Sequence, residues 1–203
     1  MTRLIAVAAP VVALLLSFAA KPASGAVMGW WTKDPMNGAI EVPVNNSAGT
    51  GMGFVDYDDS THLMRFQATF SGLTGTTTAS HIHASASITP FSPTGTAGVA
   101  TPTPSFPGFP NGVQAGTYDN TLDLTQSTSW NPAFVTANGG TPATAEAAFI
   151  GMMNSGRAYW NIHTSFAGGG EIRGFMHTPE PGAVSLLAGA ALVAAIRRRS
   201  RAS

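Results

Sequence analysis

The stretch HLMRFQATF, residues 62–70, places Met64, Phe66, Ala68 and Phe70 at every second position. Successive side chains of an extended strand point to opposite faces, so these four would share one apolar face. A helix would instead need apolar residues three or four positions apart. The stretch therefore predicts a half-buried β-strand, and it constrains the fold class more than any other feature of the chain.

Similar short runs recur between residues 27 and 178, separated by clusters of glycine, threonine, serine and proline. Before the first strand, GMGFVDY and the turn DDST read as the other arm of a hairpin. Later, AYWNIHT and GEIRGFM are joined by SFAGGG, whose glycines can take the positive φ values of a hairpin loop. Helical periodicity is nearly missing from the same region, so we predict an all-β domain over residues 27–178.

One segment departs from this pattern, TPATAEAAFIGMMNSG. Thr141 is a suitable N-cap, Pro142 suits the first turn, and apolar residues follow at spacings of three and four. Gly156 would end the segment. We predict one short helix over about residues 142–154, and we interpret its methionines as packing residues and not as a copper motif.

A second irregular segment covers residues 92–111 and holds five prolines. Proline cannot donate a hydrogen bond to a neighbouring strand, so this segment is not a central strand. We predict a long surface loop. Two interpretations of Phe106 and Phe109 are open, since these rings either pack onto the domain or form an exposed contact patch.

The N-terminal residues 1–26 have the order of a secretory signal peptide. Arg3 precedes an apolar run, and small residues follow up to Ala26, where we expect cleavage. The sequence therefore predicts export of the protein across the inner membrane.

The C-terminal residues 179–203 contain an apolar stretch followed by Arg197, Arg198 and Arg199. Basic residues stay on the cytoplasmic side of a membrane. We therefore expect an apolar C-terminal helix that anchors the protein in the membrane, with the domain on the other side.

The tripeptide Pro179, Glu180 and Pro181 stands directly before this apolar stretch. The order of tripeptide, apolar segment and arginine cluster closely resembles the PEP-CTERM sorting signal of Gram-negative bacteria that make exopolysaccharide. The resemblance implies that an exosortase removes the tail and passes the protein to the cell surface or matrix. The alternative is a retained tail anchor.

Charge and cysteine content exclude several classes of function. Residues 27–181 hold four basic and ten acidic residues, a net charge of −6. Nucleic-acid binding needs basic residues to displace counterions from phosphates, so we expect no nucleic-acid partner. The chain has no cysteine, which removes disulfides, thiolate nucleophiles and cysteine metal sites from consideration.

Three segments together resemble the CHRD domain, named after chordin. They are GAIEVPVNNSAGTGMGFVDYD from Gly38, FSGLTGTTTASHIHASA from Phe70, and GRAYWNIHTSFAGGGEIRGFM from Gly156. The resemblance covers about residues 36–177, and HIH with NIHT and GGEIRG is its most specific part. It implies an antiparallel Greek-key β-sandwich or barrel found in extracellular modules, with no established enzymatic activity. The chain departs from the family in its proline-rich loop and at Phe175.

The resemblance gathers five residues into one motif: His81, His83, His163, Glu171 and Arg173. Side chains of a strand alternate between two faces, so both histidines of HIH should lie on the face opposite the isoleucine between them. By the same rule, His163, Glu171 and Arg173 should share one face of another strand pair. We expect all five to be neighbours, with imidazoles that titrate near neutral pH beside the carboxylate.

Two interpretations of this motif are open. In one, His81, His83 and His163 bind zinc or copper, which imidazole suits. In the other, the histidines join strands through hydrogen bonds to Glu171, to Arg173 or to the backbone. HIHASA also faintly resembles the His-x-His strand of copper/zinc superoxide dismutase, which would make the metal redox-active.

The sequence offers no catalytic residues. It contains no nucleophile motif such as G-x-S-x-G, and Asp56, Asp58 and Asp59 are bunched in one turn instead of flanking a groove. We expect an exported, non-catalytic protein without a cofactor, located at the cell surface or in the extracellular matrix, that contacts exopolysaccharide or surface proteins. The alternative is a zinc- or copper-binding protein on a superoxide-dismutase-like barrel.

Overall fold

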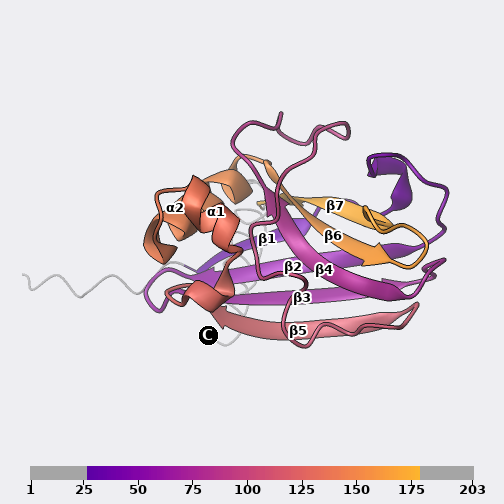
Figure 1. Cartoon of the computed structure of the whole chain (residues 1–203), viewed down its shortest axis with the longest axis horizontal. Helices are drawn as coiled ribbons and strands as arrows, with labels where there is room; N and C mark the ends of the chain where they lie inside the picture. Colours follow the sequence, from indigo (N-terminus) through magenta and orange to yellow (C-terminus); the bar gives the residue numbers. More distant parts are fainter. Residues whose placement is uncertain (1–26, 179–203) are drawn as a thin grey trace, which may run out of the picture.

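The structure is a computed structural model, and it describes residues 27–178. These residues form one seven-stranded antiparallel sheet in the order β4-β6-β7-β1-β2-β3-β5, which curls into a half-barrel (Figure 1). The strands are β1 Val27–Thr32, β2 Thr50–Asp58, β3 Leu63–Ser71, β4 Thr77–Ala84, β5 Gly116–Asp123, β6 Ala158–Thr164 and β7 Ile172–His177. The predicted all-β antiparallel fold is confirmed, and its two faces belong to a single curled sheet.

The predicted alternation of β3 places its apolar side chains in the core. Met64 and Phe66 are both fully buried, and Phe66 pairs across the sheet with Val55 of β2. The ring centroid of Phe66 lies 6.3 Å from that of Trp160 on β6. Trp160 packs so closely on β2 that an added Cβ at Gly53 would lie 2.8 Å from the indole ring, so glycine is required there.

The proline-rich loop, residues 92–111, closes the open side of the half-barrel. The outer edge of β4 has no strand neighbour, and the loop backbone pairs with it: Ala100 N–H donates to Ile82 O at 2.9 Å and Phe106 N–H donates to Ser80 O at 2.9 Å. Phe106 and Phe109 are buried. Their rings pack on Tyr118 of β5 and Phe70 of β3, so the loop joins β4 to the far end of the sheet.

The predicted helix is confirmed as α2 Pro142–Asn154, with Thr141 as its N-cap. A second helix, α1 Pro132–Ala137, was not predicted. Six residues are too few to show a helical period, although Asn131 caps α1 and a proline begins it. Short 3-10 turns at Gly38–Ile40 (η1) and Ser127–Ser129 (η2) complete the described elements.

The helices cover one end of the half-barrel (Figure 1). Trp130, Phe134 and Phe149 pack together there, with ring centroids between 5.6 and 6.2 Å apart. Glu146 of α2 accepts a hydrogen bond from the Tyr57 hydroxyl and contacts His62 Nδ1 at 2.8 Å. Apolar packing therefore joins the two helices, and one buried carboxylate ties α2 to β2 and to the turn before β3.

The predicted signal peptide, residues 1–26, and the predicted sorting segment, residues 179–203, lie outside the described residues. Within residues 27–178, no helix has the length and apolar character needed to cross a membrane.

The closing role of the loop predicts a large stability effect from a side chain that belongs to no regular strand. Replacing Phe106 by Ala should lower the free energy of unfolding by about 3 to 5 kcal/mol, because the truncation leaves a cavity between β4 and β5. Urea unfolding of the purified protein measures this change. Phe166→Ala is the control, since Phe166 is 45% exposed, and an equal effect of the two substitutions would contradict the closing role.

Candidate metal centre

The polar face of β4, β6 and β7 is buried. The sequence predicts a half-buried strand at β6, but all seven of its residues are buried. The loop between β4 and β5 and the segment around η1 cover this face: His83 bridges to Val99, and Asn37 bridges to Arg173. The cross-strand pairs beneath them are His81 with Asn161, His83 with Tyr159, Asn161 with Arg173, and Tyr159 with Phe175.

The backbone holds each of three imidazoles through its Nδ1 atom. His81 Nδ1 lies 3.2 Å from Pro104 O, His83 Nδ1 lies 2.7 Å from Ala97 O, and His163 Nδ1 lies 2.9 Å from Gly168 O. A carbonyl oxygen can only accept, so each Nδ1 carries the proton. The neutral rings therefore present unprotonated Nε2 atoms.

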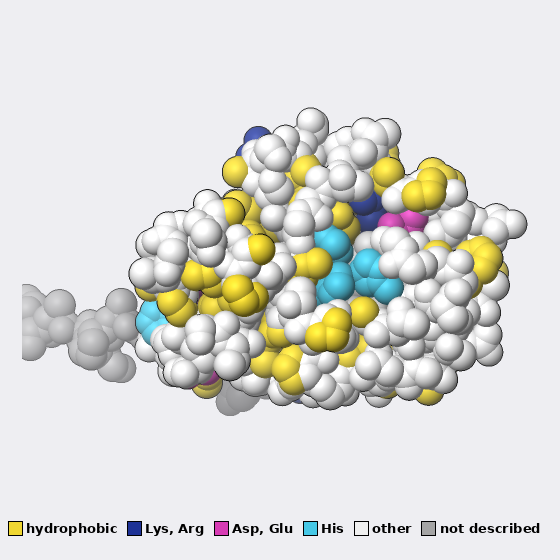
Figure 2. Space-filling model, viewed as in Figure 1, with side chains coloured by type: hydrophobic (Ala, Val, Ile, Leu, Met, Phe, Trp, Pro, Cys, Tyr) yellow, Lys and Arg dark blue, Asp and Glu magenta, His cyan; other side chains and the backbone are white. Residues whose placement is uncertain are grey.

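The Nε2 atoms of His81 and His163 point at each other at a distance of 2.8 Å. One ligand atom from each of His81, His83 and His163 lies within 4.8 Å of the other two. Figure 2 shows histidine side chains gathered on one face of the domain and visible from solvent, with basic and acidic side chains beside them. The structure thus brings together the three histidines that the sequence singles out.

Burial keeps these imidazoles neutral. It lowers the pKa of His81 to about 3 and that of His83 to about 4, and it also lowers the pKa of His163. The expectation that the cluster titrates near neutral pH is therefore wrong, because the cost of burying a charge outweighs the effect of any nearby carboxylate.

Two unprotonated Nε2 atoms cannot form a hydrogen bond with each other, and their lone pairs repel unless a cation lies between them. A third imidazole nitrogen, His83 Nε2, is buried without a hydrogen-bond partner among the described residues 27–178. Two nitrogens bound to one tetrahedral zinc ion at about 2.0–2.1 Å would be about 3.3 Å apart. A metal ion would thus fit after a small separation of the His81 and His163 rings.

The donor set specifies the kind of metal. Three neutral imidazoles suit Zn²⁺ and Cu²⁺, and they do not suit Mg²⁺ or Ca²⁺, which prefer oxygen ligands. The carbonyls that fix each Nδ1 are the usual outer partners of metal-binding histidines, because they set the tautomer and the ring orientation.

Glu171 does not contact this cluster. Its carboxylate accepts hydrogen bonds from Ser47 Oγ at 2.5 Å, Thr164 Oγ1 at 2.5 Å, Thr74 N at 2.5 Å and Gly75 N at 3.0 Å. Burial would raise the pKa of Glu171, but these hydrogen bonds lower it overall. Glu171 therefore ties β7 to the segments around residues 47 and 74 and keeps its charge.

Arg173 anchors the loops that cover the site. It is 1% exposed, and it donates from Nε to Ile40 O, from Nη1 to Gly95 O at 3.0 Å and from Nη2 to Pro93 O at 2.5 Å. Its guanidinium lies 4.7 Å from the ring centroid of Tyr159, and His83 stacks on the same ring at 4.8 Å. Arg173 is thus a neighbour of the histidine cluster, as the motif implies, but its bonds go to the backbone.

Sequence reasoning missed Glu41 as a residue of this region. Within residues 27–178, the buried side-chain atoms that have no hydrogen-bond partner are Glu41 Oε1, His83 Nε2 and Asn161 Oδ1, and Glu41 Oε2 lies 4.0 Å from Arg173 Nε. Asn161 occurs in the same alternating strand as His163, and period two predicts the same polar face for both. No local sequence pattern predicts that Glu41 lies in this region, because Glu41 belongs to a loop far away in the sequence.

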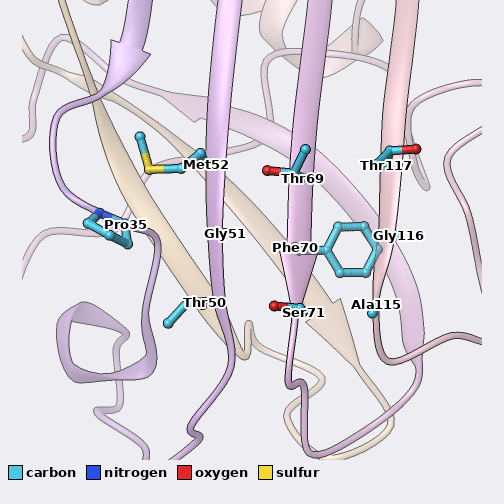
Figure 3. Close-up of a pocket in the computed structure, with 10 residues that line it drawn as sticks. All are labelled: Pro35, Thr50, Gly51, Met52, Thr69, Phe70, Ser71, Ala115, Gly116 and Thr117. Carbon is cyan, nitrogen blue, oxygen red and sulfur yellow. The ribbon is translucent and has the colours of Figure 1, made fainter.

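Figure 3 shows a different concave region, an open groove of about 610 Å³ along β2, β3 and β5. It is lined by Pro35, Thr50, Gly51, Met52, Thr69, Phe70, Ser71, Ala115, Gly116 and Thr117. Four of these residues carry hydroxyls, the other six are apolar residues or glycines, and none is titratable. The groove can form hydrogen bonds, but the nitrogen atoms that a transition-metal ion would need lie at the histidines.

Comparison with known families gives one match. The sequence model of the CHRD domain matches residues 33–176. No curated protein and no solved structure matches the chain.

Burial of neutral histidines predicts loss of stability in acid for the metal-free protein. The unfolded chain binds protons at the ordinary histidine pKa of 6.5, whereas folded His81 and His83 resist protonation down to about 3 and 4. Stability is thus fully present above pH 6.5 and is lost as pH falls, by up to about 1.4 kcal/mol per pH unit for each histidine. Urea unfolding between pH 7 and 4.5 measures the slope.

Protonation of Glu41 changes the stability of the folded protein in the opposite direction, so a variant is needed to isolate the contribution of a histidine. Burial raises its pKa to about 7, so it adds stability as pH falls from 7 toward 4.5. Hydrogen bonding to Glu146 also raises the pKa of His62. The three cluster histidines and His177, whose pKa values are all lowered, act in the other direction. His83→Gln should make the acid slope shallower by about 1 kcal/mol per pH unit. Equal slopes for the parent and this variant would show that His83 is not held neutral.

Proposed function

The chain belongs to the CHRD domain family. We propose that it is an exported protein. We also propose that its β domain holds one transition-metal ion between His81, His83 and His163. Membership of this family is consistent with an extracellular or secreted protein. The main supporting observation is that one ligand nitrogen from each of these three histidines lies within 4.8 Å of the other two, while a backbone carbonyl fixes the Nδ1 of every ring.

Hydrogen bonding between the strands alone does not account for this arrangement. An imidazole that only joined two strands would use both nitrogens, whereas His83 Nε2 has no partner and the Nε2 atoms of His81 and His163 face each other. A bound cation would satisfy all three nitrogens at once. Copper and zinc are the metals proposed.

We propose a binding and stabilising role for this metal and no catalysis. The metal would join β4 to β6 beneath the covering loops, at positions 82 residues apart in the chain for His81 and His163. Since the unfolded chain does not hold the ligands together, binding free energy would add to the free energy of unfolding.

The cell surface or matrix is the proposed destination. Support comes from Pro179, Glu180 and Pro181 followed by an apolar stretch and Arg197 to Arg199, which an exosortase would recognise and remove. The membrane anchor would be transient. Surface proteins or exopolysaccharide are the proposed partners, for which the hydroxyl-lined groove of Figure 3 offers hydrogen-bonding groups.

Metal titration tests the centre. Adding Zn²⁺ or Cu²⁺ to chelator-treated protein should raise its melting temperature, because the folded state alone binds; a metal concentration 100 times the Kd adds about 2.7 kcal/mol. Differential scanning calorimetry and bound-metal analysis measure the two effects. One ion per chain is expected.

Variants separate the metal site from a purely structural cluster. His83→Ala and His163→Ala should not respond to metal, whereas His62→Ala should respond like the parent, because His62 lies at Glu146 and outside the cluster. A parent that binds no metal, with both cluster variants merely less stable, would establish that the histidines only join strands.

The sorting proposal predicts the mass of the mature protein. Intact-mass analysis of protein recovered from the cell surface should show a chain that ends near residues 179–181 and lacks Arg197 to Ser203. A surface form that retains these arginines would instead establish a permanent tail anchor.

A further inference from the structure

A row of side chains crosses five neighbouring strands on the side of the sheet that faces away from the core. Its members, which we call the outer row, are paired across the strands: His177 with Trp31, Trp31 with Phe54, Phe54 with Gln67, and Gln67 with Asp119. Each member directly follows or precedes a core residue in its own strand, so all five side chains point away from the core. The strands lie in the order β7-β1-β2-β3-β5, and since neighbouring strands are about 4.8 Å apart, the row runs for about 19 Å along the sheet.

The aromatic rings of the outer row are accessible. Phe54 is 45% exposed, and Trp31, His177 and Gln67 are partly exposed. Phe91, at the edge of the loop that covers β4, β6 and β7, stacks on His177 with ring centroids 4.0 Å apart and is 43% exposed. Within residues 27–178, the cover of the polar face therefore ends at a band of aromatic rings that large ligands can reach.

Planar polar groups continue the row beyond the rings, and they are held in place by one another. Arg65 donates from Nε to Asp119 Oδ1 at 2.7 Å and from Nη2 to Asp119 Oδ2 at 2.5 Å, and Gln67 Nε2 lies 3.4 Å from the same carboxylate. The Arg65 and Asp119 side chains are about half exposed. Guanidinium, amide and carboxylate groups have more than one donor or acceptor each, so this network can also bind the hydroxyls of a ligand.

The groove of Figure 3 lies directly beside the outer row. Figure 3 shows Met52, Thr69 and Thr117 next to one another across β2, β3 and β5, where they are cross-strand partners. Met52 is two positions from Phe54, and the two threonines are two positions from the members of the outer row on β3 and β5. The groove of about 610 Å³ therefore adds hydroxyls along one side of the row.

The charge of this surface limits the kind of ligand. The outer face of β2, β3 and β5 carries one basic side chain and four carboxylates, a net charge of −3: Arg65 with Asp56, Asp58, Asp119 and Asp123. Such a surface repels an acidic polymer and does not repel an uncharged one. Its aromatic rings also stand among polar side chains, unlike the apolar centre of a stable protein interface.

We propose that the outer row binds an uncharged polysaccharide whose sugar rings stack on Trp31 and Phe54. The faces of a sugar ring carry C–H groups, which are attracted to the electron-rich face of an aromatic ring. The hydroxyls at the rim of the sugar would bond to Gln67, to Arg65 and to the threonines of the groove. This inference rests on the proposed contact with exopolysaccharide and names its site and its charge class, and it does not depend on the metal centre.

Calorimetric titration of the purified full-length protein tests the proposal. The probes are three uncharged polymers, hydroxyethylcellulose, galactomannan and dextran, and one acidic polymer, alginate. The parent should bind at least one uncharged polymer and should not bind alginate. Phe54→Ala should weaken this binding at least tenfold because it removes the most exposed ring of the row, whereas Phe54→Tyr keeps a ring and should bind like the parent. Gln67→Ala should also weaken binding, and it tests the row without changing an aromatic residue.

Phe166→Ala is the matched control. Phe166 is as exposed as Phe54, but it lies in the connection between β6 and β7 and outside the outer row, so this variant should bind like the parent. Equal binding by the parent and Phe54→Ala, or tighter binding of alginate than of every uncharged polymer, would overturn the proposal. So would a dimer that Phe54→Ala abolishes, seen by analytical ultracentrifugation without binding to any uncharged polymer, because the row would then join two copies of the chain.

Polysaccharide extracted from the surface of the producing cells separates this proposal from the proposed partner. If immobilised extract retains the parent and Phe54→Ala equally, the contact with exopolysaccharide stands and the outer row is the wrong site. If it retains neither protein, the proposed exopolysaccharide partner is wrong as well. Retention of the parent and loss of Phe54→Ala would support both.

Discussion

The pairing of the proline-rich loop with the edge of β4 is the interaction on which the rest of the structure depends. A curled sheet with a free edge exposes backbone donors and acceptors and leaves its core open on one side. Hydrogen bonds from Ala100 and Phe106 satisfy that edge, and the Phe106 side chain enters the core. The loop can then turn back over the polar face, where its carbonyls at Ala97 and Pro104 reach the imidazoles. Closure of the half-barrel and orientation of the histidines thus have one cause.

Burial of a polar face is costly unless its groups are paired, and this domain pairs them mainly with backbone carbonyls. Arg173 is the clearest case, because its fully buried guanidinium donates hydrogen bonds to three carbonyls, while the Glu41 carboxylate lies 4.0 Å from Nε. Glu171 uses backbone amides and hydroxyls in the same way. The two charged residues of the motif therefore hold the segments around the site in place. Within residues 27–178, the buried side-chain atoms that stay without a hydrogen-bond partner are on His83, Asn161 and Glu41, and a metal ion would satisfy the first of them.

Local periodicity was enough to predict the strands around residues 63–70 and 158–164 and the helix at Pro142–Asn154, because each is decided within a few residues. The shared face of His81 and His83 followed from the same period of two. Burial of that face could not be predicted, since it depends on a loop whose prolines give no period and on a segment more than 100 residues before β6. The near-neutral titration expected for the histidines was wrong for that reason. Glu41 lies far from the motif in sequence, and it was missed.

A metal ion at this position would also affect the loop that covers the polar face of β4, β6 and β7. Without it, the Nε2 atoms of His81 and His163 repel at 2.8 Å, and the rings can separate only if their Nδ1 contacts to Pro104 and Gly168 shift. Binding of the proposed metal would remove this repulsion and would favour the loop conformation that also fills the core with Phe106. Stability of the closed half-barrel and affinity for the proposed metal would then be thermodynamically linked. A substitution that loosens the loop should weaken metal binding, although it touches no ligand.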